Sequence, residues 1–127
     1  MDMKTFKAGN IEVMSHDYYR RKSHKGTLHM DWTDYNYPQF DLFISKLKEE
    51  GWRVPTEKEA YYLLELHKIW IGGFSDKWSP YSSYFIEPIV RDLPLENKIR
   101  VLNFHTGKIE SNLQKHTLGL LRLVRSL

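Results

Sequence analysis

The segment 51–59, with the sequence Gly-Trp-Arg-Val-Pro-Thr-Glu-Lys-Glu, constrains the fold of this chain more than any other. Pro55 has no backbone N–H and confines Val54 to extended geometry, so the chain cannot be helical before this point. Thr56 can accept a hydrogen bond from the backbone of Glu59, whose side chain can reach back in return, as in a capping box. The segment therefore predicts a turn that leads directly into a helix.

Two helices are predicted on either side of this turn. The first begins at Pro38, carries apolar residues at helical spacing and ends before Gly51. The second begins after the Thr56 cap and ends at the glycine pair 72–73. Both helices lie in the first 73 residues, and the predicted strands lie before and after them.

Short apolar and alternating segments predict the strands. They form a hairpin around Gly9–Asn10, strands over 27–32, 99–104 and 120–127, and a return strand that begins at Lys108. Because both terminal segments are strands, the two ends of the chain are expected to meet. The order predicts an α+β fold in which two helices pack on a curved antiparallel sheet. Trp32 and Trp52 are assigned to its core.

The amino-acid composition narrows the classes of function that this chain can have. A chain of 127 residues fits a single domain spanning 1–127. With 0 Cys, it has no disulfide framework, no thiol nucleophile and no cysteine-ligated metal. The net charge of +3 permits an acidic or nucleic-acid partner without requiring one. The N-terminus lacks the apolar core of a signal peptide and no run is long enough to span a membrane, so a cytoplasmic protein is expected.

No catalytic constellation emerges from the motifs. The six histidines do not form metal-binding pairs at helical spacing, and the glycine pair 72–73 lacks the remainder of a phosphate-binding loop. Ser82 and Ser83 lack the context of a nucleophile elbow. We therefore expect a protein that is not an enzyme and that carries no cofactor and no metal.

The segment 18–26 is predicted to be a basic loop and is the first candidate contact surface. Its candidate partner-binding residues are Tyr18, Tyr19, Arg20, Arg21, Lys22 and Lys25. Arginine and lysine can bind phosphates while tyrosine rings stack on bases, which suits single-stranded RNA or a nucleoprotein. The same charges would also suit an acidic protein surface, or a solvated loop that binds nothing.

The segment 78–95, within the loop-rich region 74–97, is the second candidate contact surface. Protein-binding surfaces concentrate large aromatic residues at their centres, and this half of the chain is rich in them. The aromatic residues in and beside the segment are Trp70, Phe74, Trp78, Tyr81, Tyr84 and Phe85. About half of them are expected to fill the core. Trp78, Tyr81 and Tyr84 are the predicted partner contacts.

The order of these motifs resembles the bacterial C-type-lectin-like domains of the DUF1566 group, also described as the Lcl C-terminal or Fibrobacter paralogous group. The resemblance is carried by segments 9–13, 30–32, 51–56, 71–74 and 122–125, and it covers almost the whole chain. It implies a C-type-lectin-like fold: two helices packed on a twisted antiparallel sheet, with a long variable-loop region and paired terminal strands. Members of this fold mostly bind proteins or ligands.

The chain departs from this family in two places and lacks the chemistry of two related activities. Segments 18–26 and 32–51 are longer than the family pattern and are expected to carry individual function. Without cysteine, the oxidase chemistry of formylglycine-generating relatives is excluded. Calcium-dependent sugar binding is also not expected, because Glu87–Pro88 is followed by Ile89, which offers no side-chain oxygen ligand.

We therefore expect a non-enzymatic binding protein that recognises a protein or ribonucleoprotein partner. The alternative is an inhibitor of bacterial defence encoded by a phage or mobile element. An anti-CRISPR protein that acts on an RNA-guided nuclease of type VI would be one example. Direct RNA contact through the basic loop is compatible with both, and neither requires a membrane.

Overall fold

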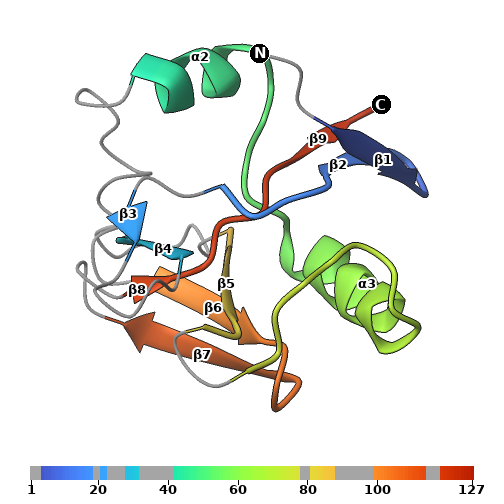
Figure 1. Cartoon of the computed structure of the whole chain (residues 1–127), viewed down its shortest axis with the longest axis vertical. Helices are drawn as coiled ribbons and strands as arrows, with labels where there is room; N and C mark the ends of the chain where they lie inside the picture. Colours follow the sequence, from blue (N-terminus) through green and yellow to red (C-terminus); the bar gives the residue numbers. More distant parts are fainter. Residues whose placement is uncertain are drawn as a thin grey trace.

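The structure is a computed structural model of the whole chain (Figure 1). It describes residues 4–18, 21–22, 28–31, 42–77, 81–87, 99–113 and 118–127. Within these residues the helices are α2 (Leu42–Glu49) and α3 (Glu57–Lys68). The start predicted for the first helix, at Pro38, lies outside the described residues. Gly51, with a φ of 92°, follows the end of α2 as predicted.

The strands pair antiparallel in groups that lie beside α3 and below α2 (Figure 1). One group has the order β1-β2-β9, another β3-β4-β8 and another β5-β6-β7. Their bounds are β1 (Thr5–Ala8), β2 (Ile11–Met14), β3 (Arg21–Lys22), β4 (Leu28–Asp31), β5 (Ser83–Ile86), β6 (Ile99–Asn103), β7 (Lys108–Leu113), β8 (Leu118–Gly119) and β9 (Val124–Ser126). The described residues thus form a mixed α+β fold.

The terminal strands meet, as the sequence predicts. β1 and β2 form the N-terminal hairpin, in which Phe6 faces Val13, and β9 pairs with the other edge of β2, where Val13 faces Val124. The backbone of Arg53 adds a bridge to the far side of β9, because Arg53 and Val124 exchange both backbone hydrogen bonds, at 2.9 and 2.8 Å. The turn before α3 is therefore tied to the C-terminal strand.

The predicted capping box is present at the start of α3. The backbone N–H of Glu59 donates to Thr56 Oγ1 at 3.2 Å, and the Thr56 N–H donates to Glu59 Oε1 at 2.9 Å. Arg53 donates to both carboxylate oxygens of Glu59, at 2.7 and 3.0 Å. The Glu59 carboxylate thus accepts hydrogen bonds from the backbone at the start of α3 and from the Arg53 guanidinium.

Replacing Glu59 with glutamine is expected to remove a stabilisation that depends on pH. Hydrogen bonds from Arg53 hold the pKa of the Glu59 carboxyl below its ordinary value of 4.5. The unfolded chain therefore binds this proton more readily, so the stabilisation is complete above pH 4.5 and is lost as the pH falls through the lowered pKa. Glu59→Gln should lower the free energy of unfolding by about 1 kcal/mol at neutral pH. Urea unfolding should show the difference vanishing in acid.

The parent chain is the control for this measurement at each pH. Burial raises the pKa of the Asp17 carboxyl, so Asp17 gives a pH dependence of opposite sign, but it is present in both proteins and cancels in the difference. A difference between parent and variant that stays constant from neutral to acidic pH would contradict the assignment to Glu59.

Buried apolar side chains form two clusters. One lies between α3 and the strands and includes Leu63, Ile86 and Leu102. The other gathers around Trp52 and Phe85. Trp52 is 4% exposed, which confirms its assignment to the core, whereas Trp32 lies outside the described residues.

The structure differs from the sequence predictions in four places. Helix α3 ends at Lys68, before the glycine pair 72–73, because a turn centred on residue 70 closes it. Arg21–Lys22 is a short strand where a loop is predicted, because it pairs with β4. β5 lies inside the segment predicted to be loop-rich, since burial on both faces removes the alternation that marks a strand. Within the predicted strand 120–127, Val124–Ser126 forms β9, whereas β8 (Leu118–Gly119) precedes the predicted segment and belongs to another sheet.

Candidate functional site

A tight turn closes the C-terminal end of α3. The N–H of Ile71 donates to the carbonyl of Leu66 at 3.0 Å, and the N–H of Trp70 donates to the carbonyl of His67 at 2.9 Å. This pair of bonds is the Schellman motif, which places one residue in the left-handed region and most often uses glycine there. Here Trp70 occupies that position, with a φ of 62°. Trp70 is the only residue other than glycine with a positive φ among the described residues.

The same turn exposes three large apolar side chains. Ile69, Trp70 and Ile71 are all exposed, and Trp70 is 86% exposed. We call these three residues the α3 terminal surface. The largest side chain on this surface therefore occupies a backbone conformation that favours glycine and buries little area within its own chain. Neither property stabilises the fold.

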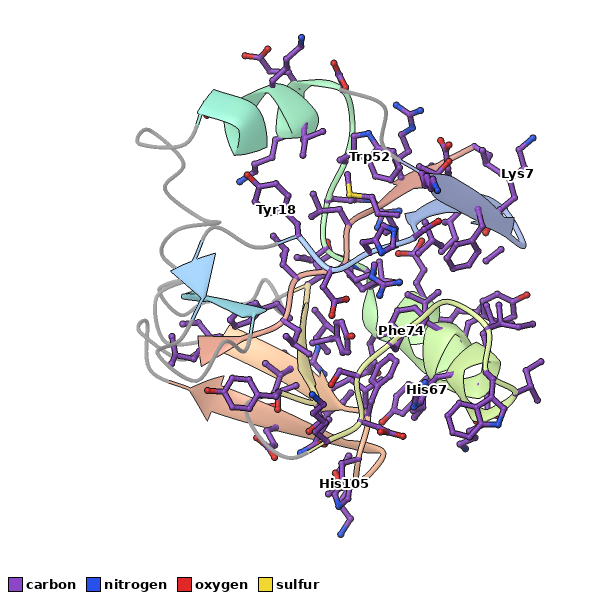
Figure 2. The ribbon with its side chains drawn as sticks, in the orientation of Figure 1. Lys7, Tyr18, Trp52, His67, Phe74 and His105 are labelled. Atoms are coloured by element: carbon purple, nitrogen blue, oxygen red, sulfur yellow. The ribbon has the colours of Figure 1, made fainter. Side chains whose placement is uncertain are left out.

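A pocket of about 280 Å³ lies beside Trp70, between the end of α3 and the turn 104–107 that joins β6 to β7. Leu64 and Phe104 contribute apolar lining, and Lys68, Asp76 and His105 contribute polar groups. In Figure 2, His67 lies on α3 and His105 lies below it, at the turn that follows β6. The pocket is thus built from segments far apart in the sequence.

Two histidines bind Asp76, and all three residues line this pocket. His67 Nε2 lies 2.9 Å from Asp76 Oδ2, and His105 Nδ1 lies 2.9 Å from the backbone carbonyl oxygen of Asp76. A carbonyl oxygen only accepts hydrogen bonds, so His105 Nδ1 carries the proton of that bond. The Nε2 atom of neutral His105 is then a hydrogen-bond acceptor. The contact with the carbonyl thus fixes which nitrogen of His105 carries a proton when its ring is neutral.

Neighbouring residues hold the His67 ring and the turn that carries His105. The His67 ring is buried, with its centroid 5.6 Å from Phe104, 6.3 Å from Phe74 and 6.2 Å from Trp70. The turn that carries His105 is fixed by Asn103, whose Oδ1 accepts the backbone N–H of His105 at 2.9 Å. The His67 ring and the backbone of the turn that carries His105 therefore have defined positions before anything binds.

A buried arginine supports the segment behind the pocket. Arg122 is 1% exposed and donates to the carbonyls of Gly72 and Gly73, at 2.5 and 3.0 Å, and from Nε to Asp17 Oδ1 at 2.8 Å. Its guanidinium also lies 4.2 Å from the centre of the Phe74 ring. The loop that follows Trp70 is therefore anchored to the core through its own carbonyl groups.

Tyr84 completes this buried network. Its hydroxyl donates to Asp17 Oδ2 at 2.9 Å and accepts the N–H of Ser75 at 2.8 Å. Burial, together with the Asp17 carboxylate, raises the pKa of Tyr84 well above its ordinary value of 10.0. Tyr84 is 2% exposed, so its assignment as a partner contact is wrong: it packs between Phe74 and Phe104 in the core.

The other predicted contact residues do not gather into one described surface. Tyr18 is partly buried against the Trp52 cluster, with its backbone bonded to Leu121. Tyr81 is also partly buried, and its carbonyl accepts the Ser75 hydroxyl at 2.5 Å. Arg21 and Lys22 lie in strand β3, which pairs with β4. The predicted contacts outside the described residues are Tyr19, Arg20, Lys25 and Trp78.

The pocket and the special position of Trp70 are not apparent from the sequence. His67, Asp76 and His105 are 9 and 29 residues apart, and no local spacing brings them together. The glycine pair 72–73 was a signal that a helix end was near, but the turn forms two residues earlier, at Trp70. The sequence signal for this turn is a tryptophan, Trp70, two residues before the glycine pair.

No metal centre or membrane helix is found in the described ranges. Within them no three histidine or carboxylate side chains are grouped so as to hold a metal ion, and neither helix has the length and apolarity to cross a membrane. No protein-family model matches the sequence, and no curated protein is similar to it at a significant level.

Proposed function

We propose that this chain is a non-enzymatic binding protein that recognises a protein or ribonucleoprotein partner through the α3 terminal surface. The observation that carries the proposal is Trp70, which is 86% exposed in a left-handed backbone conformation. Tryptophan is among the residues that contribute most to binding energy at protein interfaces. Strained backbone conformations also concentrate at functional sites.

The surroundings of Trp70 support the same function. Ile69 and Ile71 extend the apolar surface on both sides, and Lys68 and Glu65 form an exposed ion pair at 2.8 Å beside it. An apolar centre with a charged rim is the usual arrangement of a protein-binding surface. Arg122 holds the following loop rigidly, which reduces the entropy lost on binding.

The scaffold that we propose is C-type-lectin-like. The pairing of β9 with β2, the capping box of α3 and the position of the glycine pair after that helix are consistent with this fold. In this proposal the α3 terminal surface lies after the second helix of the scaffold. It is a different contact region from the basic loop and the segment 78–95 expected from the sequence.

Trp70→Gly is expected to abolish partner binding without unfolding the protein. The tagged chain is used to capture partners from a lysate of its source cells, with and without nuclease, and a captured protein is then purified and titrated by calorimetry. Loss of a central tryptophan should weaken binding by at least about 30-fold, which corresponds to about 2 kcal/mol. Glycine suits the left-handed position, so the folded state should persist.

Leu127→Ala is the matched control, because it removes another exposed apolar side chain, at the end of β9. It should bind like the parent. Equal affinity of the parent and Trp70→Gly would rule out the α3 terminal surface as the binding surface. Capture that depends on intact nucleic acid would identify a ribonucleoprotein, and not a free protein, as the partner.

A further inference from the structure

The pocket beside Trp70 presents two hydrogen-bond acceptors fixed to one backbone position. His67 occupies only Oδ2 of Asp76, whose side chain is 53% exposed. His105 donates through Nδ1 to the carbonyl of the same residue, so its neutral ring offers Nε2 as an acceptor. A ligand that matches both groups must bring hydrogen-bond donors.

The charge of the pocket also favours a ligand that donates hydrogen bonds. Lys68 lines the pocket, but its ammonium group is bound to Glu65 at 2.8 Å, and the two charges cancel. With neutral histidines, the carboxylate of Asp76 is the remaining formal charge among the polar lining groups. A cationic donor would therefore be complementary to this pocket, although the chain as a whole has a net charge of +3.

The aromatic lining restricts the shape of the ligand. Trp70 offers an exposed indole face and Phe104 lies within the lining. Cations are attracted to aromatic faces, and to tryptophan most strongly. A pocket of about 280 Å³ has room for one long side chain.

We propose that this pocket binds an arginine side chain of the partner protein. The planar guanidinium stacks on the indole of Trp70 and donates to Asp76 and to Nε2 of His105 at once. Lysine presents a compact charge that cannot match two acceptors in one plane while stacking, so it binds less well. This inference rests on the proposed function, because it names the anchor of the partner at the same surface.

Binding of a capped arginine, Nα-acetyl-arginine amide, tests the inference directly. The protein is titrated at about pH 8, where free histidine is neutral, and followed by NMR through the indole N–H signal of Trp70, assigned by its absence in Trp70→Gly. The signal should shift and saturate at millimolar concentrations. The matched lysine amide should bind about tenfold more weakly, and the neutral citrulline amide should cause no saturable shift.

Asp76→Asn should weaken arginine binding by about tenfold, whereas Glu110→Gln, which removes an exposed carboxylate on β7, should leave it unchanged. Unfolding curves of Asp76→Asn check that its fold is intact. Equal binding of the arginine and citrulline amides, or no saturable shift at tens of millimolar, would overturn the inference. So would a shift caused by guanosine monophosphate and not by arginine, which would identify a nucleobase as the occupant.

The outcomes separate this inference from the proposed function. If arginine does not bind but Trp70→Gly still loses the captured partner, the α3 terminal surface remains the binding surface and only the arginine anchor is wrong. If arginine binds but Trp70→Gly keeps full affinity for the partner, the pocket is established as an arginine site and the proposed function fails.

Discussion

Replacing Arg122 with methionine is expected to lower the free energy of unfolding by about 3 to 5 kcal/mol. Methionine keeps much of the volume but cannot donate to the carbonyls of Gly72 and Gly73, which lose their buried partner. It also leaves the largely buried carboxylate of Asp17, which is 16% exposed, without its cation. Urea unfolding at neutral pH measures the loss.

The variant should recover part of its stability in acid. Burial already raises the pKa of the Asp17 carboxyl, and removing Arg122 raises it further. The folded variant then binds a proton more readily than the unfolded chain, so its stability rises as the pH falls through that raised pKa. Asp17→Asn combined with Arg122→Met should recover part of the loss at neutral pH for the same reason.

Arg125→Met is the matched control. Arg125 pairs with Glu12 at 2.9 Å and lies over the Trp52 ring, but its side chain is 38% exposed, so its loss should lower the stability by less than about 1 kcal/mol. If Arg122→Met were no less stable than Arg125→Met, the buried network would not be what anchors the loop behind the pocket.

Trp52→Ala is expected to lower the free energy of unfolding by about 3 to 5 kcal/mol, because it leaves a large cavity in the cluster that includes Phe85 and Leu121. Trp52 is 4% exposed, and the cluster joins the turn before α3 to the strands. Chemical denaturation with and without the substitution measures the effect.

Trp70→Ala makes the same chemical change at an exposed site and should alter the stability by no more than about 0.5 kcal/mol. The two tryptophans thus separate a structural role from a binding role. A loss of several kcal/mol from Trp70→Ala would contradict that separation, and so would a small effect of Trp52→Ala.

The features that could be predicted from the sequence depend on short-range contacts. The Thr56 and Glu59 cap closes within four residues, and the turn at Gly9–Asn10 joins adjacent strands. Trp52 was assigned correctly to the core beside this cap. In these cases the residues that determine the structure are neighbours in the chain.

The features that could not be predicted depend on distant contacts. Tyr84 was assigned to the surface because an aromatic residue in a polar, proline-rich stretch gives no sign that both faces of its strand are covered. Arg122 lies in an apolar strand-like segment, and its carbonyl partners are about 50 residues away. The pocket is formed by α3, the loop after it and the β6–β7 turn together, so no single segment of the sequence predicts it.

Stability and affinity measured on one variant, Trp70→Gly, test the role of Trp70 most directly. A residue held in a left-handed conformation for binding should give a more stable protein when glycine replaces it, by about 0.5 to 1 kcal/mol, and at least about 30-fold weaker binding to the captured partner. A variant that is less stable than the parent, or that binds the partner with unchanged affinity, would contradict a binding role for the α3 terminal surface.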